Sequence, residues 1–223
     1  MAVQQYLMMG RGGTDRNIIT GEQWAVGYNG TANLGVGDDT NCSVPEQVGS
    51  ATTWQNTMQP EGYGSGSALA VQSDGTLWGW GRNLKGALGF GNTTYTVTPT
   101  QVGSDTDWKE ATVYSDNSAA IKTDGTLWTW GEGYEGKQGH GDTTDRSSPV
   151  QVGSETDWTH LVGINEHMTI ALKTDGTLWW AGKNTALLNS PLSSMTQIGS
   201  ETDIVDAIGS SLGTGFIVFW KEA

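Results

Sequence analysis

An Asp-Gly dipeptide between runs of alternating apolar and polar residues occurs three times, at Asp74, Asp124 and Asp175, at intervals of 50 and 51 residues. Asp-Gly in this setting is the strongest short-range signal for a β-hairpin, because a type I′ turn needs positive φ at both central residues. The following glycines are Gly75, Gly125 and Gly176. Hairpins at a fixed interval predict a fold built from repeats.

A second marker occurs four times and follows the first two Asp-Gly turns at the same distance and the third at a distance shorter by five residues. It reads "EQVGSATTW" (46–54), "TQVGSDTDW" (100–108), "VQVGSETDW" (150–158) and "TQIGSETDI" (196–204). Repeats of about fifty residues made of short strands, with no credible long helix, are typical of propeller blades. We therefore predict an all-β fold: a single β-propeller domain, 1–223, of about four four-stranded blades, closed within the chain or completed by its termini. The predicted units are 1–54, 55–108, 109–158 and 159–204, with 205–223 as a closing or partner-contacting strand.

The third unit carries a recognisable consensus. "DGTLWTWGEGYEGKQGHGDTTDRSSPVQVGSETDW" (124–158) resembles a repeat of the regulator of chromosome condensation family, which reads Asp-Gly-x-Leu-Trp-x-Trp-Gly, then Gly-Gln-Leu-Gly, then Pro-x-x-Val. The resemblance implies a propeller, usually of seven blades. Four units depart from that number, so either the ring is unusually small or one chain does not make a whole ring.

The glycine-rich loops raise the alternative of a ligand cradle. A phosphate-binding loop normally occurs once, ahead of a helix. Here the glycines recur at equivalent positions of the units, as in Gly27, Gly81, Gly131 and Gly182. Recurrence of this kind indicates backbone requirements, because only glycine turns sharply without a steric penalty.

The 11 tryptophans allow two interpretations, stacking platforms for sugars or packing between blades. Nine of them recur at equivalent positions of the units, and a residue required once per blade is typical of packing. We predict these nine as the repeat core. Trp180 and Trp220 lie outside the repeated positions and are candidates for partner contact. The predicted core tryptophans are Trp24, Trp54, Trp78, Trp80, Trp108, Trp128, Trp130, Trp158 and Trp179.

Composition excludes several classes of function. With 24 acidic against 11 basic residues the net charge is −13, which disfavours nucleic acid as a partner. The single cysteine, Cys42, excludes an internal disulfide framework and a cysteine-rich zinc site. The start of the sequence has no recognisable signal peptide and no stretch is long enough to span a membrane, so we expect synthesis in a cytoplasm and no membrane insertion.

Metal and catalytic sites are not indicated. His140, His160 and His167 occur without the spacing of a metal site. The acidic turns "GDDTN" (37–41) and "GDTTD" (141–145) suit side-chain capping better than calcium, which needs six or more oxygen ligands. A nucleophile elbow joins a strand to a helix, and no credible long helix is expected here. We therefore expect no catalytic residue, no cofactor, no metal and no enzymatic activity.

The apolar C-terminal strand "GFIVFW" (215–220) is the remaining candidate contact, through Phe216, Ile217, Val218, Phe219 and Trp220. This strand and the segment 2–9 align with the same position of the repeat, and one closed ring has room for only one of them. The C-terminal strand therefore either adds as an extra outer strand or pairs with a neighbouring chain.

Short, Trp-rich repeats of this style resemble those encoded by bacteria and bacteriophages. Our leading hypothesis is a non-enzymatic bacteriophage virion protein that decorates the capsid or tail and binds other virion proteins, further copies of itself, or a host-surface glycan or protein. The alternative is a bacterial lectin-like or protein-binding propeller, in the cytoplasm or exported by a leaderless route. The family's best-known member is an exchange factor for a small GTPase that docks on nucleosomes; this third role fits an acidic chain of four units poorly.

Overall fold

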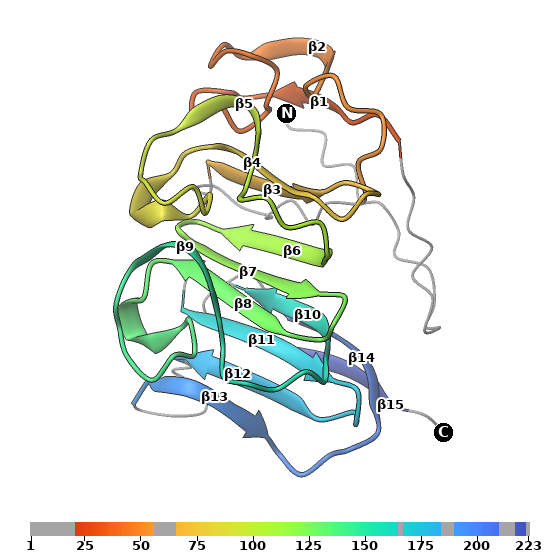
Figure 1. Ribbon diagram of the computed structural model, residues 1–223, viewed down its shortest axis with the longest axis vertical. Coiled ribbons are helices and arrows are strands. Elements are labelled where there is room, and N and C mark those ends of the chain that lie inside the picture. Colours follow the sequence, from red (N-terminus) through yellow and green to blue (C-terminus); the bar gives the residue numbers. More distant parts are fainter. Residues whose placement is uncertain (1–20, 56–65, 165–166, 184–189, 210–216, 222–223) are drawn as a thin grey trace.

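The computed structural model describes residues 21–55, 66–164, 167–183, 190–209 and 217–221. These residues form antiparallel sheets in chain order (Figure 1). The first is β1 (Trp24–Gly27) with β2 (Cys42–Gln47), and the second is β3 (Ser67–Val71), β4 (Leu77–Gly81) and β5 (Thr96–Gln101). The third holds β6 (Trp108–Tyr114), β7 (Asn117–Lys122), β8 (Leu127–Gly131) and β9 (Arg146–Gln151). The fourth holds β10 (Trp158–Ile164), β11 (Met168–Lys173), β12 (Leu178–Gly182) and β13 (Leu192–Ile198), and the fifth β14 (Ile204–Gly209) with β15 (Ile217–Lys221).

Each complete sheet is a meander in which consecutive strands pair. In the third sheet Ala120 of β7 lies opposite Trp128 of β8, and Trp128 lies opposite Gln151 of β9. The fourth sheet repeats this register with Ala171, Trp179 and Gln197. A four-stranded meander recurring in this way is the blade of a β-propeller, so the predicted all-β propeller fold is confirmed.

The Asp-Gly hairpins form, but with a different turn from the one predicted. Only the glycine has positive φ, for example +79° at Gly125, whereas Asp124 does not. The N–H of Gly125 donates to the carbonyl of Lys122 at 3.0 Å, which is the pattern of a three-residue loop ending in a left-handed glycine. The reason is the aspartate side chain, which accepts the backbone N–H of Thr126 at 3.0 Å and so caps the turn.

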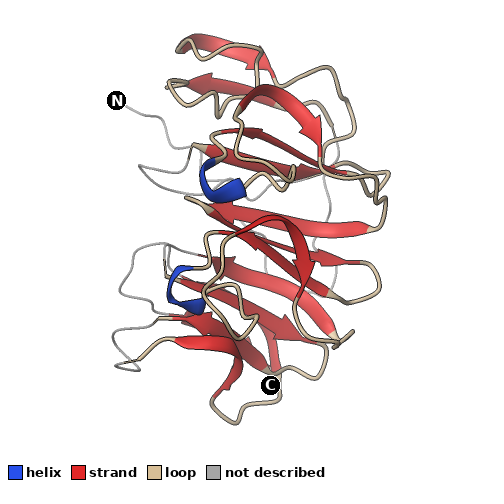
Figure 2. Ribbon diagram, turned by 60° about the vertical axis from the view of Figure 1, so that its left-hand side comes forward, coloured by secondary structure: helices blue, strands red, loops and turns tan. Residues whose placement is uncertain are grey.

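The sheets stack face to face along the long axis of the molecule (Figure 1). A separate apolar cluster fills each junction; the one between the second and third sheets includes Leu69, Leu77, Val113 and Trp130. Two short 3-10 turns, η1 (Leu84–Gly86) and η2 (Tyr134–Gly136), lie on the same side of the stack (Figure 2). They belong to the glycine-rich loops.

Those loops lock each sheet to the next. The indole N–H of Trp130 donates to the carbonyl of Ala87, in the loop of the preceding sheet, at 2.8 Å. Trp80 does the same one unit earlier, donating to the carbonyl of Asn33 at 3.0 Å. The side chains of Trp80 and Trp130 are 0% exposed as a result.

The described sheets form an open stack. The first sheet lies at one end and the strands β13, β14 and β15 lie toward the other (Figure 1), so closure of a ring within the described part of the chain is not seen. β15 pairs with β14 of its own chain, with Ile208 opposite Val218. The pairing leaves contact of this strand with a neighbouring chain as a prediction, because β14 occupies one edge of β15. Phe216 and the segment 2–9 lie outside the described residues.

Candidate binding surface

The repeated aspartates hold tryptophans in place. The Asp124 carboxylate accepts the hydroxyl of Thr126 at 2.7 Å, and the same hydroxyl accepts the indole N–H of Trp128 at 2.8 Å. The hydrogen bonds from Thr126 lower the pKa of Asp124. The same chain of bonds occurs at Asp74, Thr76 and Trp78 and at Asp175, Thr177 and Trp179. These carboxylates already have partners within the fold.

Two lysines lie between pairs of tryptophans. The Nζ of Lys122 lies 4.7 Å from the ring centre of Trp108 and 4.8 Å from that of Trp128, and it pairs with Asp105 at 2.6 Å and Asp107 at 3.0 Å. Burial lowers the pKa of Lys122, but these two carboxylates raise it more, so the pKa lies above its ordinary value. Lys173 repeats the arrangement with Trp158, Trp179 and Asp157. In both places a lysine of the chain itself occupies the space between two indole rings, where a cationic ligand would otherwise bind.

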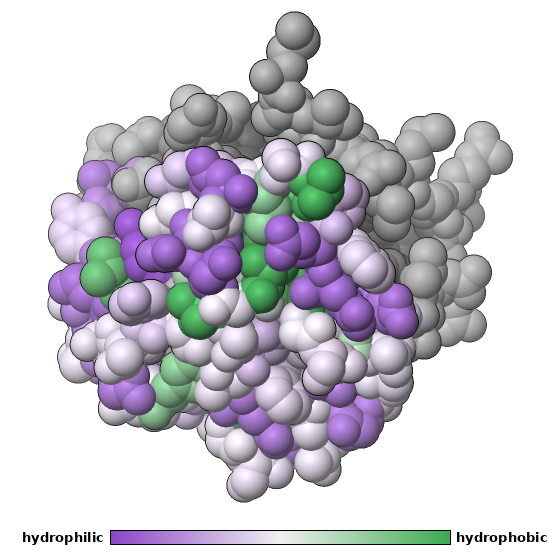
Figure 3. All heavy atoms as spheres, turned by 90° about the horizontal axis from the view of Figure 1, so that it is seen from above, coloured by the Kyte–Doolittle hydropathy of each residue, from purple (hydrophilic) through white to green (hydrophobic). Residues whose placement is uncertain are grey.

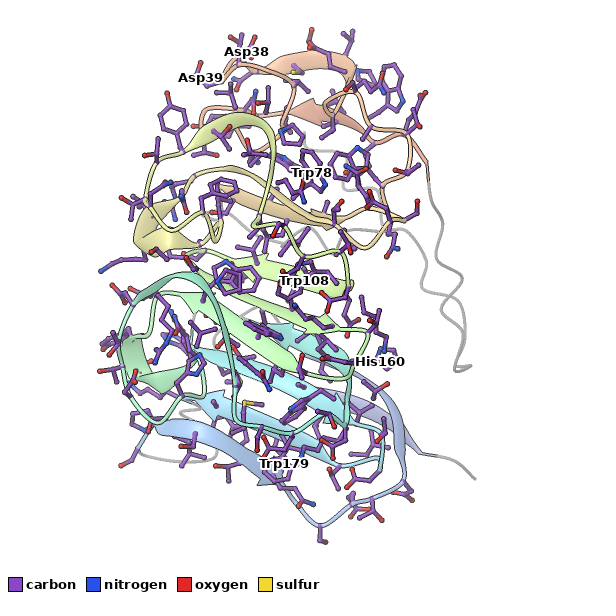
Figure 4. The ribbon with its side chains drawn as sticks, in the orientation of Figure 1. Asp38, Asp39, Trp78, Trp108, His160 and Trp179 are labelled. Atoms are coloured by element: carbon purple, nitrogen blue, oxygen red, sulfur yellow. The ribbon has the colours of Figure 1, made fainter. Side chains whose placement is uncertain are left out.

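Most tryptophans of the predicted core lie inside the stack. Trp54, Trp80, Trp108, Trp130 and Trp158 are buried, and Trp78, Trp128 and Trp179 are half-buried. Figure 4 shows Trp78, Trp108 and Trp179 distributed along the stack.

Two tryptophan predictions need correction. Trp24, predicted as core, is 58% exposed, because no further sheet among the described residues covers its side of the first sheet. Trp180, predicted as an exposed contact, is only 4% exposed, because it packs in the cluster with Met168, Ile170 and Ile204. For Trp220 the structure describes the backbone pairing with Asp206 alone.

The first sheet presents exposed apolar residues at the end of the stack. We call Trp24, Val26, Tyr28 and Val44 the end surface; each of them is more than half exposed. In Figure 3, which views the molecule from this end, individual apolar residues lie among hydrophilic ones.

Comparison with the equivalent positions of the later units shows which packing contact is missing at the end surface. Val26 occupies the position that Trp80 and Trp130 hold in the next two units, yet it is 54% exposed where they are 0% exposed. Those two tryptophans are covered by the loop of the preceding sheet. Val26 and its neighbour Trp24 therefore lie on a sheet face that, elsewhere in this chain, is a packing interface.

The histidines and acidic turns do not converge. His140 bonds to Thr129 at 2.9 Å and His167 to Glu135 at 3.0 Å, while His160 lies 3.7 Å from Glu110. Burial, then the nearby Arg146, lowers the pKa of His140. Within the described residues no group of three His, Cys, Asp or Glu side chains is placed to hold a metal ion.

The acidic turn residues have partners of their own. Asp142 pairs with Arg146 and Asp145 with Lys85, each at 2.9 Å, and Asp38 accepts the backbone N–H of Thr40 at 2.8 Å. Asp38 and Asp39 lie at the end of the stack far from His160 (Figure 4).

None of the helical segments in the described ranges has the length and apolar character that a membrane-spanning helix requires.

Comparison with known proteins agrees with this architecture. The family model "Regulator of chromosome condensation (RCC1) repeat" matches residues 74–121 and 124–170. A stretch of 98 residues is 32% identical to the X-linked retinitis pigmentosa GTPase regulator of Canis lupus familiaris, covering 44% of this chain and 10% of that protein.

Solved structures show the same fold. Human WBSCR16 superposes with a TM-score of 0.74 at 19% identity, over 92% of this chain and 54% of that one. Prp20p of Saccharomyces cerevisiae, described with its binding properties to Gsp1p and histones, superposes with a TM-score of 0.72 at 16% identity, over 90% and 52%. The chain thus spans about half the length of these two structures.

Proposed function

We propose that this chain, which carries repeats of the regulator of chromosome condensation family, is a non-enzymatic propeller module that binds other proteins through its end surface. The observation that carries the proposal is the exposure of Trp24 and Val26 on a sheet face whose counterparts in later units are packing interfaces. Exposed apolar side chains on a face that packs against a neighbouring sheet elsewhere in the chain are candidates for contact with a partner, and tryptophan and tyrosine are enriched where partners bury most surface.

The related propellers support protein binding as the general role. Prp20p is described by its binding to Gsp1p and histones, and a second structure shows yeast RCC1 (Prp20) bound by Kap60. The net charge of −13 favours a partner with a basic rim around an apolar patch, because opposite charges steer association.

The finer hypothesis is that the module belongs to a bacteriophage particle, made in the host cytoplasm and bound to other virion proteins or to further copies of itself. It rests on the style of the repeat consensus. Purification of particles from an infected host, followed by mass spectrometry of their proteins, tests it. Recovery of the chain at a fixed stoichiometry supports a virion role, and its absence from washed particles contradicts it.

The surface itself is tested in whichever native complex contains the chain. A double variant, Trp24→Asp with Val26→Asp, is expected to abolish incorporation while keeping the wild-type melting temperature. Tyr134→Asp is the matched control, because Tyr134 is 60% exposed on η2, away from the end surface. Unchanged incorporation of the double variant would contradict binding through this face. Catalysed nucleotide release from a small GTPase would support the exchange-factor alternative instead.

A further inference from the structure

We propose that the groove between the second and third sheets binds a neutral saccharide. The groove has a volume of about 680 Å³. One wall is the loop before β5 together with the end of that strand, and the other is β9 of the next sheet, through Ser148 and Pro149. Trp108 and Trp128 line it as well. This inference does not depend on the proposed function, because it concerns a different surface.

Aromatic side chains line the groove from both sheets. Phe90 and Trp128 are half-buried and Tyr95 is 59% exposed. Trp128 is fixed by its hydrogen bond to Thr126 and by Lys122, so its orientation is set before any ligand arrives. The C–H face of a pyranose ring packs on such rings, since an aromatic face carries partial negative charge. A preformed site with aromatic walls and a few polar groups is typical of small-ligand binding.

The polar residues of the groove suit hydroxyl groups. Tyr95 and Ser148 line the groove, and neither side chain makes a hydrogen bond to any described residue. They can therefore donate to or accept from ligand hydroxyls. Asp105 also lines the groove, and its Oδ2 accepts Lys122 at 2.6 Å.

Charge excludes an anionic ligand. Among the described residues that line the groove there is no lysine and no arginine. A phosphate or carboxylate would enter next to Asp105 on a chain of net charge −13, where Lys122 is already paired with Asp105 and Asp107. A neutral ligand rich in hydroxyl groups carries no such cost.

The next junction shows that the fold itself does not need these aromatic residues. The equivalent hollow, between the third and fourth sheets, is smaller, about 300 Å³. His140, at the position of Phe90, lines this hollow, whereas Asp145, at the position of Tyr95, does not line it and pairs with Lys85 of the second sheet. The surrounding repeat positions stay the same or similar, as in Val152, Gly153 and Trp158. Phe90 and Tyr95 thus distinguish one groove from an otherwise equivalent one, as residues selected for a ligand would.

The test titrates the full chain with four neutral probes, maltohexaose, cellohexaose, xylohexaose and chitohexaose, by isothermal calorimetry and tryptophan fluorescence. We expect at least one to bind with a Kd below about 1 mM. Tyr95→Ala and Phe90→Ala should each weaken that binding about tenfold or more, with Tyr95→Phe in between because the ring remains. His140→Ala, in the second hollow, is the matched control and should bind as the wild type does.

Folding of each variant is checked by its melting temperature; Tyr95 is largely exposed, so Tyr95→Ala is expected to keep that of the wild type. Failure of all four probes to bind would overturn the proposal, as would equal binding by Tyr95→Ala. A decamer of proline is titrated in parallel, because aromatic grooves also accept polyproline segments. Binding of that peptide alone, lost in Tyr95→Ala, would assign the groove to a peptide and overturn the saccharide.

Discussion

Replacing Trp180 by alanine is expected to destabilise the chain far more than replacing Trp24, although only Trp24 belongs to a repeated tryptophan position. The side chain of Trp180 is 4% exposed and that of Trp24 is 58% exposed. Truncating a buried tryptophan to alanine costs about 3–5 kcal/mol, the transfer free energy of the ring plus the cavity left behind. A surface substitution usually changes the free energy of unfolding by less than about 0.5 kcal/mol.

These free energies convert into separable melting temperatures. For a chain of 223 residues, 1 kcal/mol shifts the melting temperature by about 2–4 °C. Trp180→Ala should therefore lower it by roughly 6–20 °C and Trp24→Ala by roughly 2 °C or less. Circular dichroism in the far and near ultraviolet, followed against temperature and against urea, measures both.

Trp130→Ala calibrates the experiment. Trp130 is 0% exposed and its indole bonds to Ala87, so its loss should be at least as costly as that of Trp180. Equal and small shifts for Trp180 and Trp24 would refute the assignment of Trp180 to the core. A shift for Trp24 as large as that for Trp130 would refute the exposure of the first sheet.

Three further predictions concern the turns and the absence of a metal. Gly125→Ala should lower the free energy of unfolding by several times the roughly 1 kcal/mol expected for Gly103→Ala. Both glycines have positive φ, but only at Gly125 would an added Cβ collide with a backbone carbonyl, that of Thr156. Equal urea midpoints would contradict this. Hydrogen bonds from Thr126 lower the folded-state pKa of Asp124, so the ionised Asp124 stabilises the folded chain fully above its unfolded pKa, near 4, and this stabilisation is lost as the pH falls through the folded pKa. Asp124→Asn should therefore flatten the fall in melting temperature between about pH 5 and pH 3. An unchanged slope would count against this role of Asp124. A chelator should leave the melting temperature unchanged, since the described residues hold no ligand cluster, whereas a drop that added calcium reverses would point to the turns at 37–41 and 141–145.

The repeat made the architecture predictable, whereas details set by a single side chain or by a missing neighbour were not. The position of each hairpin follows from Asp-Gly, but the turn type depends on the Asp124 carboxylate capping Thr126. Exposure of Trp24 depends on what covers the first sheet, which no local pattern contains.

Burial of Trp180 had a signal in the sequence. Its repeat equivalents are Gly79 and Thr129, both buried, and Thr129 donates its hydroxyl to the carbonyl of Gln138 in the glycine-rich loop. A residue aligned with small residues at each repeat lies where space is limited, so Trp180 is better explained by packing than by contact. The groove had a signal too, in the substitution of Phe90 by His140 and of Tyr95 by Asp145 at equivalent positions.

In a chain of this kind, function is expected where the units differ. A residue repeated from unit to unit serves what those units share, which is the meander, the turn and the junction; the chain of Asp124, Thr126 and Trp128, present in three units, is such a case. A residue that differs between units while its neighbours stay the same is not needed for that shared structure. Val26, at one end of the stack, and Tyr95, inside a groove, both differ in this way. Because one surface lies on a sheet face and the other at a junction between sheets, a protein and a saccharide can occupy them without competing, and variants at Val26 and Tyr95 should affect the two kinds of binding independently.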